Sequence, residues 1–236
     1  MARPDNYNRI DRASSYIERT GSVLEAEFIG GVDKDEYDKL AFEILRKDEL
    51  ARINKIEDKD EKIFQRFKAM EQAKNMFLSH HDYVAKDNYL GRQDSIELVE
   101  KTQKGDPENP KRFFIRSLLN AIKGRFDEKY TLKFFTAAGG THLDVAHGID
   151  GFFKLYDKDS GKELAMATID LSGNKSKDKV KKADVLISIN GDERDRYIPS
   201  AENKDFDKEF FNEKMEYFSE EIVNALITDY QNRYKD

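Results

Sequence analysis

Apolar positions recur every three or four residues through the first part of the chain. Between Asp33 and Ile53, apolar side chains occupy one face of a helix and charged side chains occupy the opposite face. The same spacing continues over residues 60–84, over a shorter segment from Asp94 to Thr102, and over residues 111–126. Asp33 is placed to cap the first of these helices. The first part of the chain is therefore predicted to be helical.

The pattern changes after residue 128. Residues 129–138 alternate between apolar and polar positions as a strand does, and a polar turn then separates two apolar runs, "GFFKLYD" and "ELAMATIDLS". A compact apolar strand follows over Ala183–Ile189, and a long helical pattern closes the chain. We predict an α+β fold. Residues 110–236 should form a mixed central sheet with a β-hairpin flanked by helices, and residues 1–109 a helical region packed on it.

One aspartate interrupts each apolar run of the hairpin. If Asp159, Ser160 and Gly161 form the loop, Lys158 faces Lys162, and counting back places Asp150 opposite Asp170. Directly opposed side chains share one face of a sheet, with Cβ atoms about 4.5–5.5 Å apart. A four-residue loop would shift the register by one residue and place the two aspartates on opposite faces.

Two opposed carboxylates repel each other unless a proton or a cation lies between them. Carboxylate oxygens are the ligands that Mg²⁺ or Mn²⁺ prefers, so a metal site is one explanation of Asp150 and Asp170. The alternative is that each aspartate lies on an edge strand and faces water. The apolar residues around both positions favour the first explanation.

The composition of the chain excludes several kinds of site and several classes of protein. The chain has 236 residues, a net charge of −6 and no cysteine, which excludes disulfides, cysteine nucleophiles and thiolate metal sites. No apolar run approaches the roughly 20 residues that span a bilayer, and residues 1–12 lack the apolar segment of a signal peptide. We therefore expect a cytoplasmic protein that does not enter a membrane.

A local cluster of positive charge follows the second aspartate. Residues 174–182 carry five lysines around a single Asp178, so phosphate groups would be attracted there in spite of the negative net charge. A solvated surface loop is the alternative explanation. The lysines are Lys175, Lys177, Lys179, Lys181 and Lys182.

The segment "GTHLDVAHGIDGFFKLYDKDSGKELAMATIDLSGNK", followed by "KADVLIS", resembles the core of the PD-(D/E)XK nuclease superfamily. It is similar in particular to small phage-type members, in which a Thr-x-x-Asp-x-x-x-Gly-x-Asp segment precedes the hairpin. The resemblance covers residues 129–189. It implies that residues 133–136 form the first core strand and Ala183–Ile189 the fourth.

The resemblance also implies a set of site residues. Asp150 would be the first metal-binding acid and Asp170 the second, with the backbone carbonyl of Leu171 as a further ligand. Asp144 matches an additional acid that contacts the metal directly or through water. A helix glutamate often completes such a site. The two candidates for it are Glu25 and Glu43, and the sequence does not select between them.

The chain departs from the family pattern at the lysine. Asp170 and Leu171 are followed by Ser172, where the pattern has lysine, and Lys175 is the next lysine along the chain. If Lys175 reaches back, the resemblance implies a Mg²⁺- or Mn²⁺-dependent nuclease that hydrolyses DNA, encoded by a phage and working in the host cytoplasm or the virion. Lys175 would then stabilise the negative charge of the transition state.

Two other functions stay open at this stage. A catalytically inactive relative would serve as a nucleic-acid-binding, virion-associated or inhibitory interaction protein, and an unrelated α/β structural protein would carry the aspartates on its surface. A homodimer, or a protein partner at the N-terminal helices, is compatible with either. His142 and His147 flank Asp144, and ordinary hydrogen-bonded loop histidines are favoured there over a metal ligand or a general base.

Overall fold

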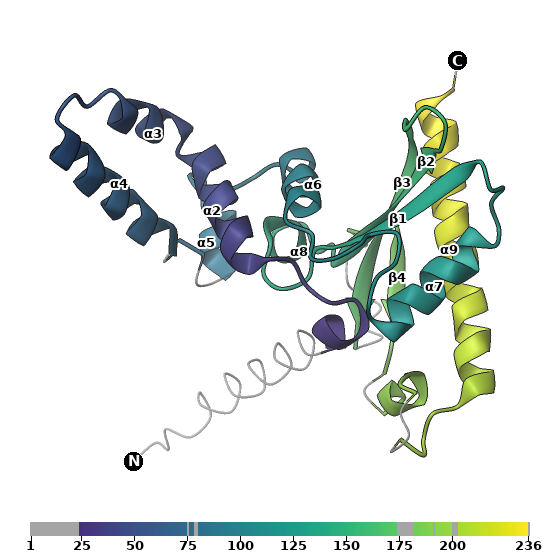
Figure 1. Cartoon of the computed structure of the whole chain (residues 1–236). Coiled ribbons are helices and arrows are strands. Elements are labelled where there is room, and N and C mark those ends of the chain that lie inside the picture. The colour runs from purple at the N-terminus through teal and green to yellow at the C-terminus, as the bar shows by residue number, and fades with distance from the viewer. Residues whose placement is uncertain are drawn as a thin grey trace, which may run out of the picture.

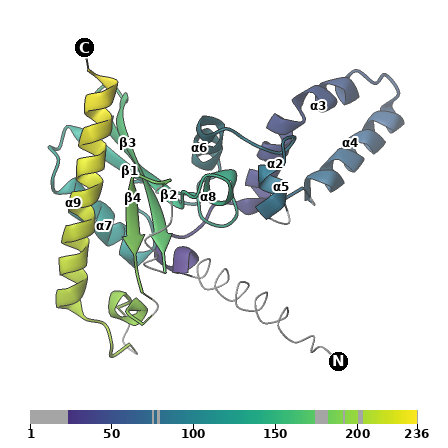
Figure 2. The same ribbon diagram turned by 180° about the vertical axis from the view of Figure 1, so that it is seen from behind.

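The structure is a computed structural model that describes residues 24–235 apart from 75, 78–79, 174–181, 191 and 200–202. Within this part of the chain, four strands form one mixed sheet with helices on both faces (Figure 1, Figure 2). The strands lie in the spatial order β1-β2-β3-β4. The first three are antiparallel and β4 runs parallel to β3. The predicted α+β class, with a hairpin in a mixed sheet and a helical N-terminal region, is confirmed.

The elements follow one another as helices, strand, hairpin, strand and helix. The strands are β1 (Tyr130–Thr136), β2 (Gly151–Asp157), β3 (Glu163–Ser172) and β4 (Val185–Ser188). The helices are α2 (Lys34–Leu45), α3 (Lys47–Asn54), α4 (Lys59–Lys74), α5 (His80–Val84), α6 (Arg92–Lys101), α7 (Phe113–Lys123), α8 (His142–Val145) and α9 (Lys208–Arg233), with a 3₁₀ turn η1 at Arg194–Tyr197. Among the residues described, no helix combines the length and the apolar character that crossing a bilayer requires.

Helices α7 and α9 cover one face of the sheet. The apolar stripe of α7, including the fully buried Leu118 and Leu119, packs against the side chains of β1, β2 and β3 that point to this face. Helix α9 adds its own buried stripe, from Phe211 to Leu226. A helical turn at residues 24–28 joins the same core through Leu24 and Phe28. Its position matters below, because it brings Glu25 to the sheet.

On the opposite face of the sheet, α6 packs against β1 with α8 beside it, and α2 and α5 pack on these two helices. Phe135 of β1 and Phe152 of β2 stack with ring centroids 5.2 Å apart, and this pair belongs to a core that also contains Tyr37 of α2 and Leu98 of α6. The N-terminal helices therefore share a hydrophobic core with the sheet. Asp150 lies at the margin of this core, directly before β2.

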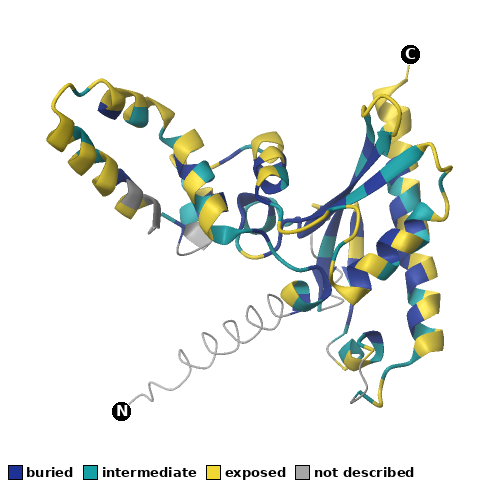
Figure 3. Ribbon diagram, in the orientation of Figure 1, coloured by how far each residue is buried: buried dark blue, intermediate teal, exposed yellow. Residues whose placement is uncertain are grey.

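Helices α3 and α4, with the end of α2, project from the body as an arm (Figure 1, Figure 3). Its buried apolar cluster is small and consists of Phe42, Ile53 and Ala69, with a few partly buried neighbours. The helix predicted over residues 33–53 divides at Arg46, whose guanidinium donates hydrogen bonds to the Asp87 carbonyl at 2.7 Å and to the Asn88 side chain at 2.8 Å. The arm is thus attached to the body through the break between α2 and α3.

Strand β3 extends beyond the short β4, which leaves part of its outer edge without a strand partner. Carboxylates accept the amide hydrogens of that edge. Asp229 of α9 accepts from the Met166 N–H at 2.7 Å, and Asp184 accepts from the N–H and the hydroxyl of Thr168 at 2.8 and 2.6 Å. Side chains thereby replace the hydrogen bonds that a further length of β4 would have made.

Candidate metal centre

The register of the hairpin decides where its two aspartates point. The connection is one residue longer than expected, since Asp157 and Lys162 are joined by a backbone hydrogen bond of 2.9 Å around residues 158–161. A β-bulge between Leu155 and Tyr156 then shifts the register by one residue. Beyond the bulge Phe152 faces Thr168 and Gly151 faces Ile169, so the same register places Asp150 opposite Asp170. The predicted pairing is correct, but it arises from a longer loop and a compensating bulge.

Asp150 is fixed by its own backbone and side chain. Its N–H donates to the Ile169 carbonyl at 2.9 Å, and its carbonyl accepts from Ala137 and Ala138 at the end of β1. Its Oδ2 accepts the Leu171 N–H at 2.6 Å. The side chain is only 4 % exposed. A carboxylate in this environment has little freedom to move and little contact with water.

Asp144 reaches the same place from α8. Thr141 caps this short helix by accepting the Asp144 N–H at 3.1 Å, which sets the direction of the turn. The Asp144 carboxylate in turn accepts the N–H of Gly140 at 3.0 Å. Gly140 has a φ of 80°, a left-handed conformation that favours glycine. The glycine loop before α8 therefore holds the Asp144 carboxylate in place.

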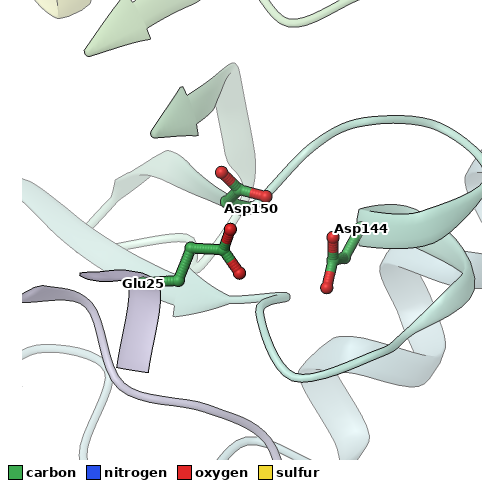
Figure 4. A group of neighbouring side chains, drawn as sticks. All are labelled: Glu25, Asp144 and Asp150. Atoms are coloured by element: carbon green, nitrogen blue, oxygen red, sulfur yellow. The ribbon is translucent and has the colours of Figure 1, made fainter. Parts of the chain in front are cut away.

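Glu25 completes a group of three acids. One carboxylate oxygen from each of Glu25, Asp144 and Asp150 lies within 4.8 Å of the other two. Figure 4 shows the three side chains directed toward a common space from the helical turn at residues 24–28, from α8 and from the start of β2. Glu43 lies exposed on α2. Of the two glutamates left open by the sequence, the structure places only Glu25 at the acids.

The electrostatics of the group are unfavourable for a charged Asp150. Burial raises the pKa of Asp150 to about 9, and the negative charges of Glu25 and Asp144 add to the rise. The hydrogen bond from the Leu171 N–H lowers the pKa without reversing it. Carboxylate oxygens are the ligands that a hard divalent cation such as Mg²⁺ or Mn²⁺ prefers, so these three acids are the residues of the site that could hold one. A cation of this kind would replace the proton on Asp150.

Asp170 lies beside this group without belonging to it. It is half-buried in β3, on the same face of the sheet as Asp150, and its charge makes a smaller contribution to the raised pKa of Asp150. The next two residues are fixed within the sheet. Leu171 uses its N–H for Asp150 and pairs with Ile187, and the buried Ser172 pairs with Ser188 of β4. Ser172 therefore occupies the strand position where the resemblance expects lysine.

Of the five lysines predicted to bind phosphate, one can be placed. Lys175, Lys177, Lys179 and Lys181 lie outside the described residues. Lys182 is exposed, and its Nζ lies 3.5 Å from the Ala146 carbonyl oxygen. Its side chain covers Gly148, where an added Cβ would meet Cδ of Lys182 at 3.0 Å. One cation of the run thus lies next to the loop between Asp144 and Asp150.

The two nearby histidines hold the loop in place. The Nε2–H of His142 donates to the Asn88 carbonyl at 2.7 Å, so its Nδ1 accepts from the Tyr37 hydroxyl at 3.1 Å. Burial lowers the pKa of His142 to about 4, which keeps the ring neutral. His147 donates through Nε2 to the Leu90 carbonyl at 3.0 Å. Both fit the favoured reading of ordinary hydrogen-bonded loop histidines.

Sequence comparison adds no assignment to this geometry. No protein-family model, no curated protein and no solved structure matches the chain. The arrangement of the acids on the sheet is therefore the basis for the proposal that follows.

Proposed function

We propose that this protein is a nuclease that hydrolyses DNA phosphodiester bonds with the help of Mg²⁺ or Mn²⁺. The observation that carries the proposal is the buried Asp150, held against Glu25 and Asp144 at the end of a β-hairpin. The resemblance of residues 129–189 to the PD-(D/E)XK core supports it, because the four segments expected to be core strands are neighbours in one sheet. Carboxylates grouped on a sheet in this way suit metal-assisted hydrolysis.

Each acid would have a distinct part in holding the metal. Asp150 would hold the metal in its deprotonated form, with its carboxylate oriented by the hydrogen bond from the Leu171 N–H to Oδ2. Asp144 is oriented by the Gly140 N–H and binds from the loop side, while Glu25 closes the site from the helical turn. Asp170, on the same face of the sheet, would bind through water or hold a second ion.

The remaining roles concern the phosphate. When bound, the cation supplies an activated water and neutralises charge on the leaving oxygen. Lys182, which lies beside the loop between Asp144 and Asp150, would contact a DNA phosphate. Lys175 remains our proposal for the cation that stabilises the transition state.

A second function has one specific observation in its favour. Ser172 is buried at the end of β3, paired with Ser188 of β4, at the position where the family pattern has lysine. A chain that has lost this cation and finds no substitute would bind nucleic acid, or a protein partner, without cutting. The same fold would then serve as a binding or inhibitory module.

A cleavage assay separates the two functions. We expect the wild-type protein to cut plasmid or single-stranded DNA with Mg²⁺ or Mn²⁺ and to be inactive in EDTA. Glu25→Gln, Asp144→Asn and Asp150→Asn should each lower the rate, and Asp150→Asn by about a hundredfold or more, because it removes the central charge of the site. Glu43→Gln is the matched control, since Glu43 is an exposed helix glutamate away from the acids.

Two results would contradict the proposal. A wild-type protein that binds DNA but does not cut with any metal would leave the non-catalytic function. Cutting that persists in Asp150→Asn at the wild-type rate would mean that the chemistry takes place elsewhere on the molecule.

A further inference from the structure

The outer face of α4 carries a row of exposed apolar side chains. Ile63, Phe64 and Phe67 are 57 %, 60 % and 62 % exposed, which makes them the most exposed large hydrophobic side chains among the described residues. They lie on the projecting arm, away from the sheet (Figure 1, Figure 3). A single exposed apolar residue is ordinary, but three on adjacent turns of one helix are typical of an interaction surface.

The other face of α4 is already used within the arm. The Arg66 guanidinium donates to the Asn54 side chain at 2.5 Å, the Lys62 ammonium donates to the Asn54 carbonyl at 2.6 Å, and Ala69 is buried against α2 and α3. Helical spacing directs Phe64 and Phe67 to the opposite side. The row is therefore not packed against the arm's own helices and is open to a partner.

Two charged residues bracket this row at equal distances. Asp60 precedes Phe64 by four residues and Lys68 follows it by four, so each lies about 6 Å from Phe64 along the helix axis. Both side chains are exposed. An antiparallel copy of the same helix, crossing at Phe64, would bring Asp60 to the partner's Lys68 twice. A parallel copy would place like charges together.

We propose that α4 pairs antiparallel with α4 of a second copy of this chain, with Phe64 at the two-fold axis. The pairing covers the apolar row and matches both charges, which is the self-complementarity that a two-fold interface requires. A helix of 16 residues is about 24 Å long, so the interface is smaller than the roughly 800 Å² per partner of a standard complex. The expected dissociation constant is therefore micromolar.

Sedimentation velocity of the full chain, at concentrations from about 1 to 200 μM, tests the pairing. We expect the monomer to give way to a dimer with rising concentration. Phe64→Glu should abolish the dimer, because it places two carboxylates at the axis. Tyr217→Glu is the matched control, since Tyr217 is an aromatic residue of α9 with 56 % exposure, and it should leave the dimer intact. Circular dichroism of each variant shows whether the fold is kept.

A charge exchange tests the direction of pairing. Asp60→Lys and Lys68→Asp should each weaken the dimer about tenfold, because each converts two attractive contacts into two repulsive ones. The double variant restores both contacts and should return to within about threefold of the wild type. A chain that stays monomeric at every concentration overturns the proposal. So does a dimer that survives Phe64→Glu, or a double variant as weak as the single ones.

Discussion

The two ends of the β2–β3 hairpin treat buried charge in opposite ways. Toward the turn, Glu163 at the start of β3 contacts the ammonium of Lys154 at 2.8 Å; Lys154 is only 5 % exposed and also contacts Glu100. Arg233 of α9 also pairs with Glu163, at 2.8 Å, so positive and negative side chains alternate in this network. At the other end the charges that meet have the same sign, since Glu25, Asp144 and Asp150 converge on one space.

The pKa values record this difference. Burial lowers the pKa of Lys154, but the hydrogen bonds and charges of Glu100 and Glu163 outweigh it, and the net shift is upward. For Asp150, burial and the neighbouring acids act in the same direction and raise the pKa to about 9. At Lys154, the protein's own carboxylates therefore neutralise a buried charge. Where the acids meet, burial and like charge both favour the protonated form of Asp150.

The largest predicted effect on stability is at the end of the hairpin where Lys154 pairs with Glu100 and Glu163. Lys154→Met keeps the volume of the side chain but leaves Glu100 and Glu163 without their shared ammonium. We expect a loss of about 3 kcal/mol in the free energy of unfolding, as is typical when one partner of a buried ion pair is removed. Urea denaturation measures it. Lys158→Met, at an exposed lysine of the turn, should change stability by less than about 0.5 kcal/mol. A stable Lys154→Met protein would show that the two ends do not differ.

Replacing Asp150, at the acidic end of the hairpin, should raise the free energy of unfolding, whereas replacing Lys154 lowers it. Because the pKa of Asp150 is higher in the folded protein than in the unfolded chain, its penalty is absent below about pH 4 and grows as the pH rises toward about 9. Asp150→Asn should therefore stabilise the metal-free protein near pH 8 and have no effect near pH 4.

Thermal melting in EDTA, read as the difference between variant and wild type at each pH, measures this effect. Taking the difference removes the contribution of His142, whose lowered pKa makes both proteins less stable as the pH falls from about 6.5 toward 4. A destabilised variant at high pH would mean that Asp150 is charged and compensated in the folded state.

The smallest effect concerns metal affinity. Binding must displace the proton of Asp150, so the affinity for Mn²⁺ should rise about tenfold per pH unit between about pH 6 and 8. Isothermal titration calorimetry in buffers of different ionisation enthalpy would detect the released proton. The pH dependence should persist in Glu43→Gln and disappear in Asp150→Asn. An affinity for Mn²⁺ that is independent of pH would show that metal binding does not displace a proton from Asp150.

Much of the scaffold could be predicted from the sequence because it depends on local periodicity. The strands of the hairpin and the closing helix follow directly from apolar spacing. Asp33 caps α2 as expected and accepts the Glu36 N–H at 3.3 Å. The breaks within the predicted helices were missed, among them the one between α4 and α5, because contacts with distant residues fix where a helix ends.

The composition of the site was predictable only in part. The pairing of Asp150 with Asp170 depended on loop length, and a bulge that leaves no clear mark in the sequence corrected the error. Glu25 lies more than a hundred residues from its two neighbours, so no spacing rule could select it over Glu43. The apolar pair Leu24 and Phe28, one helical turn apart around Glu25, was the available signal that this turn packs on the core.

The carboxylates of Asp184 and Asp229 on the outer edge of β3 have a consequence for how the molecule can associate. An uncapped edge would template a strand from a neighbouring chain and so invite open-ended aggregation. With those amides already engaged, copies of this protein have no such route along that stretch of β3. If copies pair through α4 as proposed, that two-fold contact closes on itself, and concentrated protein should form discrete pairs rather than fibres.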